Sequence, residues 1–239
     1  MSFNTWVMSQ NEFDFCILIT THNRPDMLSE LINQIRSQKN DLKIKIIVID
    51  DGSSEIYDIP SDVKFIKYYP NMGKKKFWKV IDSSFKYIKN INSKYYVYLQ
   101  DDVKITDNFF NGLVDKYVNI NDDSKICLSF LTDHRVNSSN WTNYTPRERG
   151  EVIKTQWVEL HFICEKKFFE TLNYSIEPIP PSRWDRNPNL SSGVGWQLSI
   201  RLHNLGKGMY HTKNTFVTHG NHESQMNKLE REKNKLIVT

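Results

Sequence analysis

Two pairs of adjacent carboxylates are the clearest candidates for chemistry: Asp50 with Asp51, and Asp101 with Asp102. Each pair follows a short apolar run that is typical of a buried β-strand. Adjacent carboxylates at a strand end repel each other and lose solvation, so a cation or hydrogen-bond donors must compensate them. Their oxygen atoms suit Mg²⁺ or Mn²⁺. One such pair alone is often a solvated turn, but two pairs in the same setting indicate a site.

Two further polar clusters also follow apolar runs. The first is Thr20, Thr21, His22, Asn23 and Arg24, and the second is Asn71, Met72 and Gly73. In an open parallel sheet, ligands bind beyond the carboxyl ends of the strands. We therefore expect all four clusters to line one edge of a sheet. The lysines at positions 74, 75, 76 and 79 bring positive charge to this edge, or they form a solvated helix face.

The elements that position these clusters alternate between strand and helix. Apolar runs at residues 16–19, 44–49, 63–66 and 95–99 predict strands. Apolar residues at helical spacing over residues 27–35 and 77–88 predict helices. Mostly apolar strands that alternate with helices predict an α/β fold, in which helices cover both faces of a mostly parallel sheet.

The second half of the chain is less regular. A helix is expected around residues 110–117, a strand over 126–131 and another strand over 157–163. A helix over residues 195–205 is expected to end at Gly206 as its C-cap. Residues 133–150 and 173–192 are too long to be mere connections, so we expect them to shape a binding site.

Length and composition limit the class of protein. With 239 residues, 38% hydrophobic residues and only 9 Gly and 8 Pro, the chain can bury a core, which excludes disordered and fibrous classes. We expect one domain over residues 1–239, divided into halves at about 12–105 and 106–222 with a tail at 223–239. The net charge of +4 fits an anionic small molecule as well as a polyanion, and it does not require nucleic acid.

Compartment is predicted from the cysteines and the apolar runs. The three cysteines are far apart and lack the spacing of a zinc site or a disulfide scaffold, which favours a reducing compartment. No apolar run is long enough for a membrane span, and the first residues do not resemble a signal peptide. A cytoplasmic protein without an integral membrane segment is expected.

Four segments of the first half carry a resemblance to a known family. They are ILITTHNRP at residues 17–25, IVIDDGSS at 47–54, NMG at 71–73 and YLQDDV at 98–103. In their order and spacing they resemble the signatures of GT-A fold glycosyltransferases of family 2, over residues 14–105. The resemblance implies the GT-A fold, a Rossmann-like and mostly parallel sheet flanked by helices, with an irregular second half that binds the acceptor.

The resemblance also implies a reaction and a set of roles. The reaction is transfer of a sugar from a nucleotide-sugar, a UDP-sugar by family habit, to a hydroxyl group with Mn²⁺ or Mg²⁺ as cofactor. Asp102 would be the metal ligand of a DXD-like motif, and His219 lies where many such enzymes place a histidine ligand. The residues implied to bind the donor are Thr20, Asn23, Arg24, Asp50, Asp51, Asn71, Gly73 and Asp101.

The implied metal chemistry agrees with the residue types. A nucleoside diphosphate leaves more readily when a divalent ion neutralises the charge on its β-phosphate. The imidazole of His219 suits Mn²⁺ better than an ion that prefers hard oxygen ligands. Gln100 stands where the motif often has its first acidic residue, which leaves more of the coordination to Asp102. His22 and His161 are interpreted as structural.

The catalytic base is the main departure from the family pattern. Val194 and Gly195 stand where the family has an acidic pair that supplies the base. Inverting transfer needs a carboxylate near the acceptor hydroxyl, so either the base comes from elsewhere or the enzyme retains configuration. Asp185, on the proline-rich loop, is our predicted base, and Asp133 and Glu159 are further candidates. A surface Asp flanked by arginines is also a common ion pair.

The acceptor stays open at this stage. Trp157, Trp184 and Trp196 flank the expected acceptor side, where they either stack on a ring or pack in the core. The acceptor hydroxyl belongs either to a glycan or to a hydroxylated base in DNA, as in phage-type DNA modification. Because of Gln100 and the missing acidic pair, a non-catalytic sugar- or nucleotide-binding module of the same fold is the alternative. The sequence does not predict an oligomeric state.

Overall fold

The first half of the chain forms a parallel sheet. The computed structural model describes residues 11–39, 41–130 and 147–219. The strands β1 (Phe13–Thr21), β2 (Ile44–Asp50), β3 (Lys64–Lys67) and β4 (Ser93–Gln100) all run parallel, with β1 between β2 and β4. These are the predicted strands. Thr21 lies opposite Asp50, and Thr20 lies opposite Gln100, so the carboxyl ends of the three strands meet at one edge.

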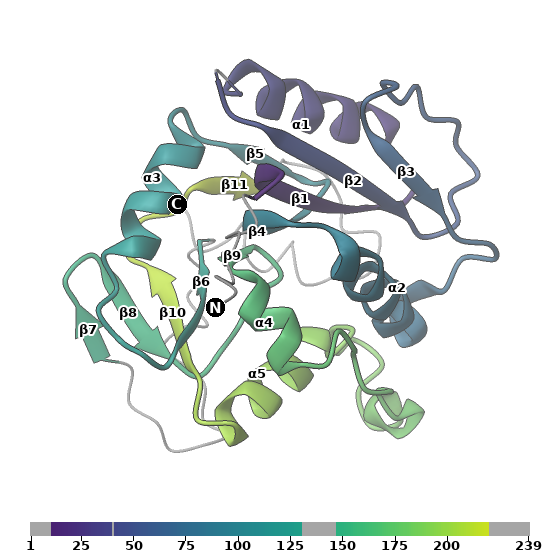
Figure 1. Cartoon of the computed structure of the whole chain (residues 1–239). Coiled ribbons are helices and arrows are strands. Elements are labelled where there is room, and N and C mark those ends of the chain that lie inside the picture. The colour runs from purple at the N-terminus through teal and green to yellow at the C-terminus, as the bar shows by residue number, and fades with distance from the viewer. Residues whose placement is uncertain (1–10, 40, 131–146, 220–239) are drawn as a thin grey trace, which may run out of the picture.

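The second half extends the same sheet with strands of both directions. The order is β3-β2-β1-β4-β9-β6-β10-β8-β7 (Figure 1). β9 (Phe162–Cys164) lies antiparallel between β4 and β6 (Lys125–Ser129), and β10 (Gly208–Thr212) is parallel to β6. The hairpin of β7 (Arg147–Arg149) and β8 (Val152–Thr155) closes the sheet. Because β9 is antiparallel, the residues just before it lie at the carboxyl ends of β4 and β6.

Helices cover both faces of the sheet, as the sequence predicts (Figure 1). The alternating side chains of β1 divide the core: Ile17 packs with α1 (Pro25–Ser37) and α3 (Phe109–Val118), whereas Leu18 packs on the opposite face. That second face is covered by α2 (Gly73–Tyr87), α4 (Lys166–Thr171) and α5 (Val194–Asn204). Short 3₁₀ helices are η1 (Ile88–Asn90) and η3 (Pro181–Trp184). No helix of the described ranges has the length and apolar character needed to cross a bilayer.

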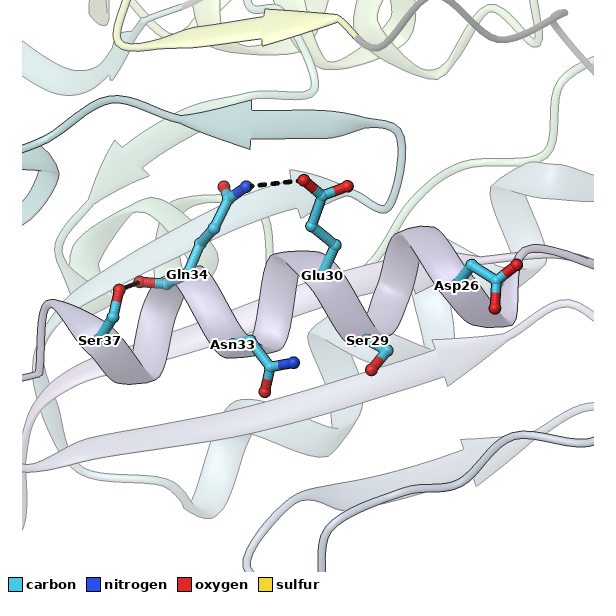
Figure 2. Close-up of a pocket in the computed structure, with 6 residues that line it drawn as sticks. All are labelled: Asp26, Ser29, Glu30, Asn33, Gln34 and Ser37. Atoms are coloured by element: carbon cyan, nitrogen blue, oxygen red, sulfur yellow. Dashed lines mark hydrogen bonds between the residues drawn. The ribbon is translucent and has the colours of Figure 1, made fainter.

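A small second sheet lies beside α1. It consists of β5 (Val103–Ile105), which follows the second acidic pair, and β11 (Val217–His219). Polar residues line one side of α1, and Figure 2 shows Glu30 and Gln34 pointing the same way from the helix. Gln34 Oε1 accepts the Ile105 N–H at 2.9 Å, and the Lys104 ammonium lies 2.5 Å from the Glu30 carboxylate. These contacts hold β5, the strand that follows Asp102, against α1.

The strand predicted over residues 157–163 is wrong in its first part, since only Phe162–Cys164 is a strand. The Val158 N–H donates to Ser199 Oγ at 2.9 Å, and the Glu159 N–H donates to Ser129 Oγ at 3.1 Å. These hydroxyl groups take the donors that a neighbouring strand would otherwise bond. The hairpin of β7 and β8 was not predicted from the sequence.

Gly206 ends α5 as predicted, but it lies one residue beyond the C-cap, which is Leu205. Gly206 has φ of +65° and donates its N–H to the His203 carbonyl at 2.9 Å, while the Lys207 N–H bonds the Leu202 carbonyl at 2.9 Å. This is the pairing in which a left-handed glycine ends a helix. Asp133 and most of the predicted loop 133–150, together with the tail at 223–239, lie outside the described residues.

Candidate functional site

The first acidic pair organises the loops after β2 and β3. Asp50 is fully buried, and both of its carboxylate oxygens lie 3.2 Å from the Ser53 N–H, while Ser53 Oγ donates to Oδ1. The Lys67 ammonium is 3.9 Å from Oδ2. Gly52 lies in the turn between Asp50 and Ser53. Its φ is +68°, a backbone conformation that residues with a side chain rarely adopt. A Cβ at Gly52 would also lie only 2.5 Å from the backbone nitrogen of Asn71.

Asp51 connects this turn to the start of α2. Its Oδ1 accepts the Met72 N–H at 2.8 Å and its Oδ2 accepts the Gly73 N–H at 3.1 Å. Asn71 Nδ2 donates to the Asp51 carbonyl at 2.5 Å. Burial raises the pKa of the Asp51 carboxyl, and the two backbone donors oppose that rise. Asp51, Asn71 and Gly73, which are predicted to bind the nucleotide-sugar, therefore lie in direct contact with one another.

Asn23 and Tyr57 close the third side of this group. Asn23 has φ of +50°, accepts the Ser54 N–H at 2.8 Å through Oδ1, and donates its own N–H to Ser53 Oγ at 2.7 Å. The Tyr57 hydroxyl lies 3.0 Å from Ser53 Oγ and 3.1 Å from the Arg24 N–H. Tyr57 was not predicted from the sequence, because it lies in a loop without a pattern; its hydroxyl joins the loop after β1 to the loop after β2.

The second acidic pair is held by Arg24. Asp101 is buried, and it accepts from Thr21 Oγ1 at 2.7 Å and from Arg24 Nη1 at 3.0 Å. Burial raises the pKa of Asp101 to about 6, although Arg24 and Thr21 both favour the charged form. The same Arg24 nitrogen is 3.2 Å from Asp102 Oδ2. The Thr20 carbonyl accepts the Asp101 N–H at 3.0 Å, and Thr20 Oγ1 accepts from the Tyr98 hydroxyl at 3.1 Å.

Asp102 and His219, the two predicted metal ligands, lie close together in the structure. The pairing of β5 with β11 places His219 opposite Val103, and His219 Nδ1 lies 3.6 Å from Asp102 Oδ1. The ring of His161 packs edge-on against His219 with centroids 5.6 Å apart. Burial lowers the pKa of His161 to about 3, with a further contribution from His219, so its imidazole is neutral. His161, interpreted as structural from the sequence, supports the His219 ring.

The donors at this point fit a divalent ion shared with a phosphate ligand. One carboxylate oxygen and one imidazole nitrogen face each other, and His219 is 40% exposed, which leaves an approach from solvent. Within the described ranges, no group of three or more His, Cys, Asp or Glu side chains could hold a metal ion. Of the described residues, Asp102 and His219 would be the two ligands, and oxygen atoms from outside them would complete the coordination.

Residues of the second half of the chain contact the start of α2. Lys74 Nζ donates to the Pro188 carbonyl at 2.7 Å, which ties the proline-rich loop to the start of α2. Asp185 is exposed at the end of η3, and its assignment as the base stays a prediction. Trp184 is buried in the core, whereas Trp196 is 37% exposed with the Arg183 guanidinium 5.6 Å from its ring centroid.

Glu159 and Trp157 lie just before β9. The Trp157 indole N–H donates to Glu159 Oε1, and both side chains are half-buried. The indole also packs towards α5, where its Cζ2 atom would lie 3.8 Å from a Cβ on Gly195. Trp157 therefore bonds the Glu159 carboxylate through its N–H and packs against α5 through its ring.

Comparison with known sequences gives one family. The family model described as Glycosyl transferase family 2 matches residues 16–171, about two thirds of the chain, and this range contains all four motifs of the first half. A search of curated protein sequences finds no match. The family match confirms the resemblance on which the expected roles rest.

Comparison with solved structures confirms the GT-A fold. S. aureus TarS 1–349 in complex with UDP-GlcNAc has a TM-score of 0.54 and 12% identity, with 89% of this chain and 60% of that chain covered. The mannosyltransferase PcManGT from Pyrobaculum calidifontis, in complex with GDP-Man and Mn²⁺, has a TM-score of 0.53 and 14% identity over 86% and 56%. Glucosyl-3-phosphoglycerate synthase from Mycobacterium tuberculosis, with Mn²⁺ and UDP-glucose, has 0.54 and 12% over 93% and 74%. The chain spans less than two thirds of the first two chains.

Proposed function

Because the chain belongs to glycosyl transferase family 2, we propose that it transfers a sugar from a nucleotide-sugar, in the first place a UDP-sugar, to a hydroxyl acceptor with Mn²⁺ or Mg²⁺ as cofactor. The observation that carries the proposal is the approach of Asp102 and His219 to 3.6 Å, beside the buried loops around Asp50 and Asp51. Residues that are distant in the sequence thus offer an ion site and a polar ligand site at one sheet edge.

The donor half supplies groups that match a nucleotide. Asn23, Asp50 and Asp51 would shape the loops that hold the nucleobase and ribose, because their side chains bond the backbone after β2 and β3. Asn71 and Gly73 stand at the start of α2, where a helix N-terminus favours a diphosphate. The complexes of TarS with UDP-GlcNAc and of PcManGT with GDP-Man and Mn²⁺ support this class of donor.

Asp102 and His219 would hold the divalent ion. When bound, such an ion supplies positive charge that stabilises the leaving diphosphate. Arg24 spans the two carboxylates, and with Thr21 it occupies both oxygens of Asp101. Asp101 would therefore orient its neighbour and face the donor, while Asp102 contributes the ligand.

For the acceptor we propose a saccharide hydroxyl. Trp196 is exposed at the first turn of α5, and a flat aromatic face suits a pyranose ring. The Arg183 guanidinium over this ring adds hydrogen-bond donors for sugar oxygens. Transfer to hydroxymethylated duplex DNA, with no transfer to oligosaccharides, would contradict this choice of acceptor.

Donor hydrolysis tests the proposal without knowledge of the acceptor. UDP-glucose, UDP-GlcNAc and GDP-mannose are each incubated with the protein and Mn²⁺, Mg²⁺ or EDTA, and the released nucleotide is measured. We expect turnover that needs the metal and that falls at least about 100-fold in Asp102→Asn. Asp107→Asn, an exposed carboxylate five residues later, is the matched control and should keep its activity.

Three outcomes would contradict parts of the proposal. Turnover in EDTA would exclude the metal role, and equal activity of Asp102→Asn and wild type would exclude Asp102 as a ligand. Binding of UDP without turnover of any donor would favour the non-catalytic binding module.

A further inference from the structure

We propose that Glu159 is the base that takes the proton of the acceptor hydroxyl, and that Trp157 positions it. The inference rests on the proposed sugar transfer and names a group that the donor and metal roles do not use. It is carried by the place of Glu159 at the sheet edge, by the fixed orientation of its carboxylate, and by the surroundings of the other carboxylates of that edge in the described part of the chain.

The backbone places Glu159 beside the metal ligands. β9 is antiparallel to both of its neighbours, so the chain before Phe162 lies at the carboxyl ends of β4 and β6. The Glu159 N–H donates to Ser129 Oγ at 3.1 Å, which fixes it to the last residue of β6. The ring of His161 lies against His219 with centroids 5.6 Å apart. Glu159 precedes His161 by two residues, so their Cα atoms are at most about 7 Å apart.

The side chain of Glu159 is oriented by Trp157. The indole N–H donates to Oε1 of the carboxylate. Trp157 is itself held, because its carbonyl lies 3.2 Å from His211 Nε2 and its ring packs towards Gly195. A neutral N–H donor on a carboxylate fixes its direction while the group keeps its negative charge. A base that must meet an acceptor proton needs such a fixed direction.

Gly195 makes room for this arrangement. A Cβ at this position would lie 2.9 Å from the Val158 carbonyl oxygen and 3.8 Å from Trp157 Cζ2. The segment that carries Trp157 and Glu159 can therefore approach the first turn of α5 because residue 195 has no side chain. The sequence has no carboxylate in that turn, and the structure brings one to it from the segment before β9.

Among the residues that the structure describes, the other carboxylates of this edge either bond other groups or are exposed to solvent. Asp50 and Asp51 bond the backbone of the loops after β2 and β3, and Asp101 bonds Thr21 and Arg24 through its two oxygens. Asp102 faces Arg24 and His219. Asp185 is exposed at the end of η3. Glu159 is half-buried and oriented, which is the setting of a base that works away from bulk water.

Glu159 would act in a single displacement at the anomeric carbon. The acceptor oxygen forms a bond to the anomeric carbon of the donor sugar, and the bond from that carbon to the diphosphate oxygen breaks. The nucleoside diphosphate leaves with the electron pair, and the acceptor proton moves to the Glu159 carboxylate and then to solvent. Attack from the face opposite the leaving group inverts the configuration at the anomeric carbon.

The first test compares two isosteric variants. Glu159→Gln and Asp185→Asn are assayed for hydrolysis of UDP-glucose, UDP-GlcNAc and GDP-mannose with Mn²⁺, with water as acceptor, and UDP binding is measured by calorimetry. We expect Glu159→Gln to lower kcat at least about 100-fold with little change in KM for the donor or in UDP binding. Asp185→Asn removes the competing base candidate and should lower kcat far less than Glu159→Gln. Glu170→Gln, at an exposed glutamate of α4, is the control and should stay within about threefold of wild type. Trp157→Phe, which keeps a ring and loses the N–H, should lower kcat about tenfold and leave KM unchanged.

The second test asks whether Glu159 acts by taking a proton. Azide is an anion that needs no deprotonation, so sodium azide should restore turnover in Glu159→Ala and yield a glycosyl azide of inverted configuration by NMR. Full activity of Glu159→Gln, a larger loss in Asp185→Asn, or no rescue by azide would overturn the assignment. A wild-type chain that turns over no donor contradicts the proposed function itself, whereas an active wild type with an equally active Glu159→Gln contradicts only the base.

Discussion

Individual residues explain how this chain tolerates two pairs of adjacent carboxylates. At the first pair the compensation comes mainly from hydrogen-bond donors, namely the N–H groups of Ser53, Met72 and Gly73. At the second pair it comes from a cation, Arg24, which lies within 3.2 Å of both side chains. The two kinds of compensation indicate different roles. Backbone N–H donors fix the conformation of a loop, whereas a metal ion can replace the Arg24 guanidinium beside Asp102.

Gly52 gives a prediction at this scale. Its φ is +68°, and a Cβ at this position would lie 2.5 Å from the Asn71 backbone nitrogen, so Gly52→Ala is both strained and crowded. We expect a loss of about 3 kcal/mol in the free energy of unfolding, measured by urea denaturation. Gly150 is the matched control, since its φ is +59° and nothing lies within 4 Å of its Cβ position. Gly150→Ala should lose only about 1 kcal/mol, and equal losses would contradict the close approach at Gly52.

Some site residues could be found from the sequence and others could not. The acidic pairs were found because each ends an apolar run, and a strand end in a parallel sheet has a known place. Tyr57 was missed because a loop has no periodicity to locate its side chain. His161 was interpreted as structural, since a buried histidine carries no sign in the sequence that its ring will lie against His219.

At the scale of elements, the strand prediction before β9 failed because side chains bond the backbone N–H groups there. Helices and strands with regular apolar spacing form where the pattern predicts them, because burial of one face decides their place. The segment before β9 has the alternation of a strand, yet the hydroxyl groups of Ser199 and Ser129 bond its N–H groups. A side-chain partner from a distant element cannot be predicted from a local pattern.

Asp122 gives a prediction at the scale of elements, because it joins β6, β8 and β10. Its carboxylate accepts hydrogen bonds from Ser124, Lys154 and Tyr210. Burial alone would raise the pKa of Asp122, but these hydrogen bonds outweigh it and hold the pKa well below its ordinary value. A carboxyl group whose pKa is lower in the folded chain stabilises the fold above its unfolded pKa of about 4, and this stabilisation is lost as the pH falls below that value.

The test compares wild type with Asp122→Asn across pH. At pH 7 the variant should be less stable by about 2 kcal/mol, because hydrogen bonds to a charged group are lost. Urea denaturation at pH 7, 5 and 3 should show this difference constant above about pH 4 and smaller at pH 3. A difference that stays the same at pH 3 would mean that the ionised form of Asp122 is not the source of the stability.

At the scale of the whole molecule, the fold brings together residues that the chain separates widely. His219 reaches Asp102 only because β11 pairs with β5, which α1 holds in place through Gln34. His219 was predicted as a metal ligand from the resemblance to family 2. The spacing of residues alone could not predict it, because no local pattern encodes this antiparallel pairing. The fold class was predictable from the alternation of strands and helices. The antiparallel direction of β9 was not.

Binding of donor and metal should therefore stabilise the whole chain. A ligand that binds only the folded chain, present at 100 times its dissociation constant, raises the free energy of unfolding by about 2.7 kcal/mol. We expect UDP with Mn²⁺ to raise the melting temperature in thermal unfolding more than UDP with EDTA. The part that depends on Mn²⁺ should disappear in Asp102→Asn and shrink in His219→Ala, while the control Asp107→Asn keeps it. An undiminished shift in Asp102→Asn would place the ion elsewhere, since the pairing of β5 with β11 is what brings the His219 imidazole to the Asp102 carboxylate.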